Sequence, residues 1–328
     1  MSVISTRAPL RVSLGGGGTD LSSYYREHEG FVVSAAIDRY VYMLTSTAFQ
    51  SRFRLKHTEW EEVDDPRAIR HPILREALLR HWNGQPLEIV SVADAPAGTG
   101  LGSSGAYTVC VLKAIELARG SESLPEELAE AACVIEIELL ERTVGKQDQY
   151  AAAHGGVNAY TFACDGSVDV RPLDLPEATL RALRENFLLF YAGGARSASE
   201  MLSHQVTRTL ARDSSVVENL HRTKAIARAS CAALEAGDLD GCAEVMNEQW
   251  ATKRQRAPGM VTPRIEDLRA TACRSGGSGV MLMGAGGGGF LLVYTPRPAD
   301  TRAAMADAGS LELRFGLDSG GCVGSSGG

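Results

Sequence analysis

Short apolar runs alternate with longer stretches of helical periodicity along the chain. Runs of β-branched, aromatic and aliphatic residues bounded by Gly, Pro, Asn or Asp are typical of strands. Apolar residues spaced three and four positions apart indicate helices with one buried face. The runs that predict strands are PLRVSL (9–14), LEIVSVA (87–93), VNAYTF (157–162), NFLLFYAGG (186–194) and GVMLMGAGGGGFLLVYTP (279–296). The predicted helices are 106–118, a short one over 147–156, 197–212, 214–237 and 239–255.

A further helix is predicted from about residue 124 to Arg142. Ser123 and Glu126 form a capping-box pattern around Pro125, which is favoured in the first turn of a helix. Because strands and helices are mixed without strict βαβ alternation, we expect an α+β fold. The final segment, DSGGCVGSSGG (318–328), is rich in Gly and Ser and is expected to fray. The apolar stripe of the helix predicted from about residue 124 consists of Leu128, Ala132, Ile135 and Leu139.

Three glycine clusters each follow a predicted strand. They are GGGGTD (15–20), AGTGLGSSG (97–105) and GAGGGG (284–289). Glycine permits positive φ and lets the backbone approach a ligand closely. One such cluster alone would be a hairpin turn, whereas three in one chain favour a shared ligand cleft.

The segment GLGSSG (100–105) matches the G-x-G-x-x-G pattern of dinucleotide-binding folds. The context differs, because the loop DAPAGT separates it from the preceding strand and a second helix, not a strand, follows its helix. A Walker A loop is excluded as well, since no Lys-Ser or Lys-Thr follows the glycines. What remains is a glycine-rich turn at a helix start, where free backbone N–H groups suit a phosphate.

Composition narrows the class of protein. The 328 residues suffice for a two-lobed unit or two domains. Forty acidic and 33 basic residues give a net charge of −7, which disfavours nucleic acid as a partner. The seven cysteines are scattered without a C-x-x-C pair, as expected of reduced thiols in the cytoplasm. No apolar stretch is long enough for a membrane span or a signal peptide, so a soluble cytoplasmic protein is expected.

The order of these segments resembles the GHMP kinase superfamily. RAPLRVSLGGGGTD (7–20) is similar to its first motif, PAGTGLGSSGA (96–106) to its phosphate-binding motif, and LMGAGGGGFLL (282–292) to its third. The resemblance implies an ATP- and Mg²⁺-dependent kinase. It also implies a lobe like ribosomal protein S5 domain 2 over residues 1–180, a ferredoxin-like lobe over 181–328, and an active site between them.

The resemblance assigns nucleotide and metal contacts to the second motif. Ser103 and Ser104 would offer hydroxyls to phosphate and Mg²⁺, although serines at a helix start are also common N-caps. Glu136, twelve residues before Asp148, would ligate the metal with Ser104, and periodicity alone leaves Glu138 as an alternative. The residues that would wrap the ATP phosphates are Gly98, Gly100, Leu101, Gly102, Ser103, Ser104 and Gly105, the last standing where the family has alanine.

The catalytic residues implied by the resemblance are Asp148 in GKQDQY (145–150) and Arg11 in PLRVSL. Asp148 would orient the attacking hydroxyl and accept its proton, and Arg11 would steady Asp148 and the transferring phosphoryl group. The alternative for Asp148 is a solvated acid at a helix start, where the helix dipole favours negative charge.

The first motif bears on the substrate. Galactokinases carry G-E-H-T-D where this chain has GGGTD, and the whole pattern looks most like D-glycero-α-D-manno-heptose 7-phosphate kinases and fucokinase domains. An anomeric sugar kinase acting on a heptose 7-phosphate is therefore expected. The alternatives are a 1-kinase for another sugar and a non-catalytic sugar- and ATP-binding regulator. The expected substrate-binding residues are Gly17, Gly18, Thr19, Asp20, Arg196, Gly286 and Gly287, with RFRLK (52–56) and KRQR (253–256) as further basic candidates.

Overall fold

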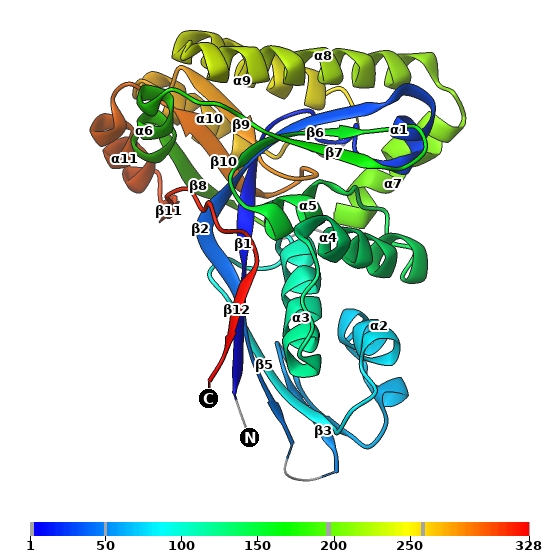
Figure 1. Ribbon diagram of the computed structural model, residues 1–328. Helices are drawn as coiled ribbons and strands as arrows, with labels where there is room; N and C mark the ends of the chain where they lie inside the picture. The colour runs from blue at the N-terminus through cyan, green and yellow to red at the C-terminus, as the bar shows by residue number, and fades with distance from the viewer. Residues whose placement is uncertain (1–2, 49–50, 195–197, 257–259, 328) are drawn as a thin grey trace.

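The computed structural model describes residues 3–48, 51–194, 198–256 and 260–327 of the chain, and side chains from residue 202 onward in the third range. Within these ranges the chain forms two β-sheets with helices packed against them (Figure 1). The larger sheet extends from the bottom of the molecule in this view to just below α8 and α9, and the smaller sheet lies beside its upper half. The fold is of the mixed α+β class, as the sequence predicts.

The larger sheet has eight strands among the described residues, and β2 is its long central member. The second half of β2 pairs with β5, while its first half pairs with β6. All pairings are antiparallel except that of β3 with β5. The strands of this sheet are β1 (Ile4–Gly15), β2 (Gly30–Thr47), β3 (Phe53–Lys56), β4 (Trp60–Val63), β5 (Leu87–Ala93), β6 (Val157–Phe162), β7 (Val168–Pro172) and β12 (Val323–Ser326).

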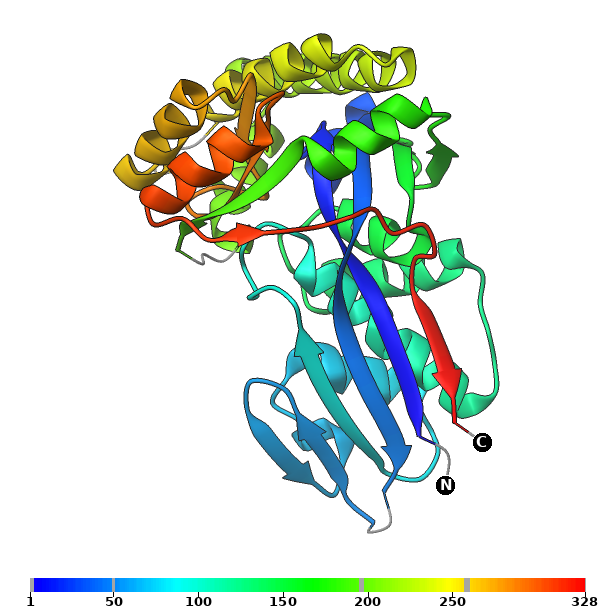
Figure 2. The same ribbon diagram turned by 90° about the vertical axis from the view of Figure 1, so that its left-hand side faces the viewer.

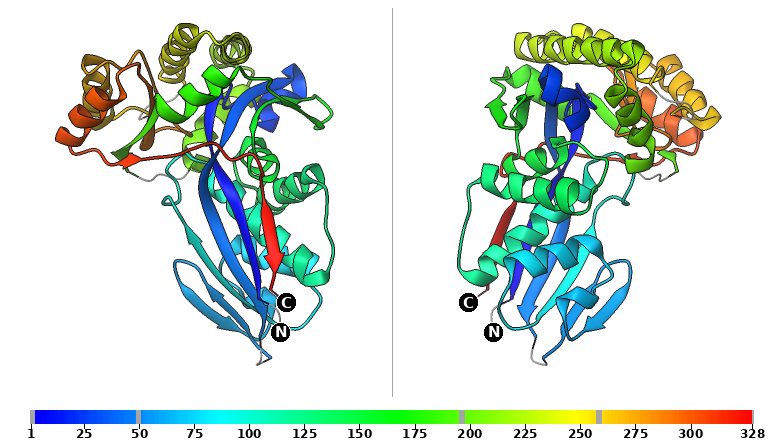
Figure 3. Two further views of the ribbon diagram at one scale, coloured as in Figure 1. Left: turned by 60° about the vertical axis from the view of Figure 1, so that its left-hand side comes forward. Right: turned by 90° about the vertical axis from the view of Figure 1, so that its right-hand side faces the viewer.

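Helices cover only one face of the lower half of this sheet. Figure 2 shows α2 and α3 behind the strands, with the opposite face open, and the right-hand view of Figure 3 shows the same helices in front. Helix α3 packs against β1 and β2, and α4 and α5 pack against α3. The helices of this part are α1 (Ser22–His28), the 3₁₀ helix η1 (Pro66–Ala68), α2 (Pro72–His81), α3 (Ser103–Arg119), α4 (Pro125–Cys133), the π-helical turn η2 (Val134–Leu139) and α5 (Gln147–His154).

The smaller sheet is antiparallel, with the strand order β11-β8-β10-β9. Helix α9 packs on β9, while its neighbour α8 packs on β1 and β2 of the larger sheet. Its strands are β8 (Phe187–Gly193), β9 (Gly279–Leu282), β10 (Gly289–Tyr294) and β11 (Glu312–Leu313). The remaining helices are α6 (Glu177–Glu185), α7 (Ala198–Leu210), α8 (Ser214–Ala236), α9 (Leu239–Lys253), α10 (Pro263–Arg274) and α11 (Pro298–Asp307).

Strand β1 changes its environment along its length. Its first four residues alternate between buried and exposed, as expected where one face of a sheet is open. From Ala8 to Gly15 every residue is buried, because α3 and α5 cover one side and α8 the other. Arg11 and Ser13 lie in this enclosed part, so β1 carries polar side chains into the interior between the lobes.

The helix predicted to begin near residue 124 has a different cap and a different end. Leu124, not Ser123, is the N-cap residue, and Glu127 accepts a hydrogen bond from the Leu124 N–H at 3.0 Å. Pro125 occupies the first helical position and sets this register. The α-helix stops at Cys133 and continues as the π-helical turn η2 to Leu139 instead of reaching Arg142.

The glycine-rich segment 318–328 was expected to fray, but part of it forms a strand. Residues Val323–Ser326 form β12, which pairs with the start of β1 next to the N-terminus (Figure 1). The backbone hydrogen bonds of an edge strand are enough to order these small side chains. The predicted division at residue 180 lies within α6, between β7 of the larger sheet and β8 of the smaller one, although β12 later returns to the larger sheet. That boundary stays a prediction.

Candidate active site

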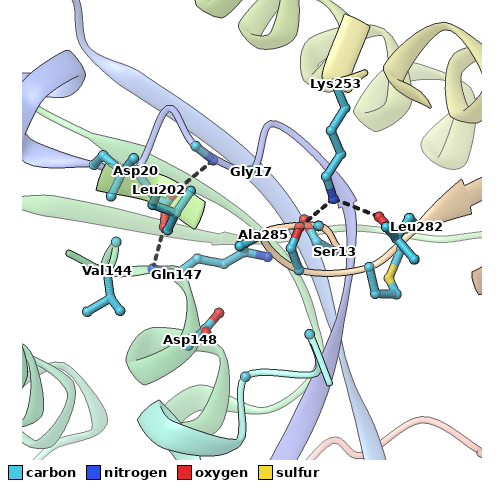
Figure 4. Close-up of a pocket in the computed structure, with 18 of the residues that line it drawn as sticks. Ser13, Gly17, Asp20, Val144, Gln147, Asp148, Leu202, Lys253, Leu282 and Ala285 are labelled. Atoms are coloured by element: carbon cyan, nitrogen blue, oxygen red, sulfur yellow. Dashed lines mark hydrogen bonds between the residues drawn. The ribbon is translucent and has the colours of Figure 1, made fainter. Parts of the chain in front are cut away.

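One pocket, called the first pocket below, lies between the two sheets and is lined by residues from both (Figure 4). The larger-sheet lobe contributes Arg11 from β1 and Asp148 from the first turn of α5. The other lobe contributes Lys253 at the end of α9. The loops 15–20, 98–102 and 283–288 supply much of the remaining wall, so all three glycine clusters meet here as the sequence predicts.

Arg11 connects the catalytic candidate Asp148 to the loop 97–105, the phosphate-loop candidate, through hydrogen bonds. Its Nη2 lies 2.6 Å from Asp148 Oδ1, and its Nε donates to the same oxygen at 2.9 Å. Its Nη1 donates to the carbonyl oxygen of Gly100 at 2.6 Å, and its backbone N–H donates to Leu101 O at 3.0 Å. The Arg11 side chain is 6% exposed and the Asp148 side chain 31% exposed, so the carboxylate faces the pocket.

The loop 97–105 ends at the first turn of α3. Gly102 is the N-cap residue with φ of +76°, a left-handed conformation that favours glycine. Ser103 and Ser104 are the first two residues of the helix, so neither serine is the N-cap. Both line the first pocket, whereas the Leu101 side chain is buried in the core and anchors the loop.

Gly105 explains a departure from the family motif. A Cβ atom at this position would lie 2.7 Å from the Cβ of Asp148 and 2.9 Å from the backbone N of Gln149. Alanine there would therefore push α3 away from α5. The two helices approach so closely that the phosphate-loop candidate and Asp148 are held in direct contact.

Glu136 lies in the π-helical turn and points at the start of α3. Its side chain is fully buried, and it accepts hydrogen bonds from Ser104 Oγ, from Gln149 Nε2 at 2.9 Å and from Arg142 Nη1 at 3.2 Å. Burial raises the pKa of Glu136, and the hydrogen bond from Ser104 and the charge of Arg142 offset part of that rise. Glu138 is exposed, and the Ser104 hydroxyl is hydrogen-bonded to Glu136 and Arg142 instead. The geometry thus separates the two carboxylates that periodicity left open.

Ser104 and Glu136 are suitable ligands for a magnesium ion. Mg²⁺ prefers oxygen donors and is usually held by one or two carboxylates together with substrate phosphates and water. A hydroxyl and a buried carboxylate in contact with each other, at the foot of a glycine-rich loop, fit that requirement. No cluster of three or more His, Cys, Asp and Glu suited to a metal occurs among the described residues.

The loop 15–20 places Asp20 at the pocket and Thr19 away from it. Asp20 Oδ1 accepts from Gly18 N at 2.9 Å and Oδ2 from Gln147 N at 3.2 Å, and burial followed by the charge of Asp148 raises the pKa of Asp20. Thr19 is fully buried, and its hydroxyl donates to Gly16 O at 2.9 Å. Thr19 therefore braces the loop and does not line the pocket, contrary to expectation.

The remaining substrate-binding candidates divide in the same way. Gly17, Gly18 and Gly286 line the first pocket. Gly287 does not line the first pocket. Its N–H donates to Met260 O at 2.9 Å, a contact that holds the loop 283–288. Arg196 lies outside the described residues.

Two cations of the first pocket, Lys253 and Arg256, come from KRQR (253–256). From the sequence this segment could equally be solvated surface. Lys253 Nζ donates to Leu282 O at 2.8 Å and to Gly284 O. Arg256 Nη1 donates to Gly17 O at 2.8 Å and Nε to Asn219 Oδ1 at 2.9 Å. Burial, and then the charges of Arg256 and Arg11, lower the pKa of Lys253 to about 7.

Four neutral polar side chains of the same pocket escaped sequence analysis. Ser13 Oγ, Gln147 Nε2 and Gln205 Oε1 are buried and have no hydrogen-bond partner in the structure. Gln249 completes the group and accepts from Gly16 N at 3.3 Å. Amides and hydroxyls both donate and accept, so this part of the wall can bind a polyhydroxylated ligand.

A second pocket continues from the first and shares Gly98, Ser103 and Ser104 with it. It is lined by the rings of His71 and Tyr107, whose centroids lie 4.9 Å apart, and by the apolar end of β5. Burial, with the charges of His57 and Arg142, lowers the pKa of His71 to about 4, so this imidazole is neutral near pH 7. The serine-rich start of α3 therefore stands between a charged pocket and a ring-lined one.

A glycine loop at a helix start, a buried carboxylate at its foot and an Arg–Asp pair facing the same pocket form a site typical of phosphoryl transfer. The comparisons with known proteins agree. The family model "GHMP kinases N terminal domain" matches residues 69–156, and "GHMP kinases C terminal" matches residues 231–310. The chain belongs to the GHMP kinase family and is a phosphotransferase.

Relatives of known activity match most of the chain. A D-glycero-alpha-D-manno-heptose 7-phosphate kinase of Campylobacter jejuni is 27% identical over 306 residues, which are 90% of either chain. A mevalonate kinase of Archaeoglobus fulgidus is 30% identical over 229 residues, 68% of this chain and 71% of that protein. The crystal structure of a D-glycero-D-manno-heptose 1-phosphate kinase from Bacteriodes thetaiotaomicron superposes with a TM-score of 0.79 at 23% identity over 98% of each chain. Among the described residues no helix is both long and apolar enough to span a membrane.

Proposed function

We propose that the protein transfers the γ-phosphoryl group of ATP to the anomeric hydroxyl of a sugar, and that the sugar is D-glycero-α-D-manno-heptose 7-phosphate. The observation that carries the proposal is the Arg11–Asp148 ion pair of 2.6 Å, which faces a pocket that also holds Asp20 and unpartnered amide and hydroxyl groups. The sequence similarity to a heptose 7-phosphate kinase over 90% of the chain supports the choice of sugar.

In this mechanism the nucleoside occupies the second pocket and the acceptor occupies the first. The phosphates then lie along the loop 97–105, where backbone N–H groups and the serine hydroxyls of α3 can donate to them. Asp148 accepts the proton of the anomeric hydroxyl while the hydroxyl oxygen bonds to the γ-phosphorus of ATP. The bond between the γ-phosphorus and the oxygen that bridges it to the β-phosphorus breaks, and ADP leaves. Arg11 holds Asp148 in position and offsets negative charge on the transferring group.

Asp20 and the amides would orient the sugar ring. The Asp20 carboxylate lies next to Gln147, one residue before Asp148, so a hydroxyl bound by Asp20 is held close to the proposed base. A magnesium ion, held by Ser104 and Glu136, would neutralise charge on the nucleotide phosphates.

The proposal is tested by measuring ATP turnover with a panel of sugars. The panel contains heptoses and hexoses, each free and with a terminal phosphate, and the position of the new phosphate is identified by NMR. We expect the heptose 7-phosphate to give the highest kcat/KM, at least tenfold above the free heptose, with phosphate added at C1. Equal use of both sugars would exclude the heptose-phosphate assignment, and phosphate on another hydroxyl would exclude an anomeric kinase.

Glu136→Gln is expected to raise the magnesium concentration needed for half-maximal activity by about tenfold or more, because the amide is a weaker ligand for a hard cation. Glutamine has nearly the same shape and can still accept from Ser104. The measurement is activity against magnesium concentration at saturating ATP and sugar.

Glu138→Gln is the matched control, since this carboxylate is two residues away on the exposed side of the same turn. We expect its magnesium dependence to equal that of the unaltered protein. The reverse result, with a defect in Glu138→Gln alone, would show that the metal ligand has been assigned to the wrong carboxylate.

A further inference from the structure

Lys253 and Arg256 lie on the inner side of the molecule because of the register of α9. Met246 and Trp250 are buried four residues apart, and Lys253 follows Trp250 by three positions on the same stripe. Its ammonium group thus points from α9 into the first pocket, toward Leu282 and Ala285 (Figure 4). Arg256 follows just after the helix and is 5% exposed.

Neither cation has a carboxylate partner within ion-pair distance among the described residues. The first pocket is lined by three cations, Arg11, Lys253 and Arg256, and by two acids, Asp20 and Asp148. Arg11 is paired with Asp148, and the two Asp20 oxygens accept from backbone N–H groups. The α9 side of the pocket therefore carries two cations without an ion-pair partner among the described residues, and the charge of Asp20 offsets only part of that of Arg256.

Lys253 also retains a donor for a ligand. An ammonium group has three N–H bonds, and two of them are directed to the carbonyl oxygens of Leu282 and Gly284. These two contacts fix the ammonium group in place, while the third N–H has no acceptor among the described residues. A buried charge without a partner is unfavourable, and burial together with Arg256 and Arg11 lowers the pKa of Lys253 accordingly. A bound anion would reverse that effect.

We propose that Lys253, supported by Arg256, forms a phosphate-binding subsite on the α9 side of the first pocket. A phosphate monoester carries a charge of about −1.5 to −2 near pH 7 and accepts several hydrogen bonds, which matches a fixed ammonium group beside a guanidinium. The ligand is a phosphate group, either the terminal phosphate of the acceptor or the γ-phosphate of the nucleotide. Naming these two sources rests on the proposed function. Arg256 donates to Gly17 of the loop 15–20, which places the subsite on the acceptor side.

The test is Lys253→Met, which keeps an unbranched side chain and removes the charge. If the acceptor supplies the phosphate, kcat/KM for the heptose 7-phosphate falls about ten- to a hundredfold while that for the free heptose is unchanged. If the nucleotide supplies it, kcat/KM for ATP falls by this factor with both sugars. Lys253→Arg, which retains the charge, should restore most of the loss. An unchanged kcat/KM for all three substrates overturns the subsite.

Lys224→Met is the matched control. Lys224 Nζ also donates to two backbone carbonyl oxygens, those of His28 at 2.6 Å and Glu29 at 3.0 Å, but it does not line the pocket. Thermal unfolding of both variants separates a loss of folding from a loss of binding. A loss of the same size in Lys224→Met would overturn the assignment to Lys253. Arg256 is less suitable for the first test because it donates to three protein partners, Gly17, Asn219 and Thr223, whereas Lys253 donates to two.

A binding experiment separates this inference from the proposed activity. Calorimetric titration with the heptose 7-phosphate and with inorganic phosphate, each without nucleotide and with a non-hydrolysable ATP analogue, needs no turnover. If the dissociation constant for the heptose 7-phosphate or for inorganic phosphate is at least tenfold larger in Lys253→Met, the subsite is supported even if the sugar panel yields no product. Equal binding by Lys253→Met and the unaltered protein under all conditions overturns it, whatever the panel shows.

Discussion

Asp148→Asn is expected to lower kcat by about 10²- to 10⁴-fold, the contribution typical of a positioned general base. The amide cannot accept the proton of the attacking hydroxyl. It still fits the space beside Arg11, whose Nη1 keeps its hydrogen bond to Gly100 O. Binding of ATP and sugar, measured by calorimetry, should therefore change little, while steady-state turnover collapses.

The control for this variant addresses the alternative reading of Asp148 as a helix-start acid. Asp240 occupies the first turn of α9, is exposed and lies outside both pockets. Asp240→Asn removes the same favourable interaction with a helix dipole and should leave kcat unchanged. Near-normal turnover in Asp148→Asn would mean that another group accepts the proton, or that none does.

Gly102→Val should abolish measurable ATP binding and turnover while the protein still folds. A Cβ atom at Gly102 would lie 3.2 Å from Arg11 Cγ and 3.2 Å from Asp148 Cγ, so the larger side chain would displace both residues and the loop. The φ of +76° adds a strain of about 1–2 kcal/mol for any other residue. Calorimetric titration with ATP and an activity assay measure the loss.

Gly120→Val is the matched control for that strain. Gly120 ends the same helix with φ of +68°, but a Cβ atom there would meet no atom within 4 Å. Both variants carry the strain of a positive φ, Gly102→Val should show the larger decrease in Tm because of its additional close contacts, and only Gly102→Val should lose ATP binding. Normal ATP affinity in a folded Gly102→Val would contradict the assignment of the loop to the nucleotide.

Strong periodic signals made about half of the described strands and helices predictable, and the long central strand β2 was not among them. LEIVSVA forms β5 over Leu87–Ala93, and VNAYTF forms β6 over Val157–Phe162, because each run fits a strand bounded by turn residues. The convergence of three glycine clusters on one pocket was also predictable, since each leaves a strand at a point where only glycine suits the backbone. The family resemblance assigned Glu136 as the carboxylate beside Ser104, whereas helical periodicity alone could not choose between Glu136 and Glu138. The π-helical turn over Val134–Leu139 changes the angular spacing on which such a prediction depends.

Side chains whose surroundings come from distant parts of the chain escaped prediction for a similar reason. Lys253 reads as a solvated charge in KRQR, although its spacing of seven from Met246 is a signal that places it on the buried stripe of α9. Gln205 and Gln147 have no such signal. They become ligand-binding candidates only because α5 and α7 each bring one of them to the loop 15–20, where Gln147 N donates to Asp20 Oδ2 and Gln205 Nε2 donates to Gly18 O at 3.1 Å.

The two neighbouring helices α8 and α9 have a consequence for motion in this enzyme. They pack against each other, yet α8 rests on β1 and β2 while α9 rests mainly on β9 and touches β1 less extensively (Figure 2). We expect a displacement of one sheet relative to the other to slide one helix along its neighbour. We therefore expect the entrance for substrate to widen by small shear steps between packed side chains rather than by free rotation about a flexible linker. Because Lys253 ends α9 and Arg11 lies on β1, each such step changes the distance between the positive charges on opposite walls.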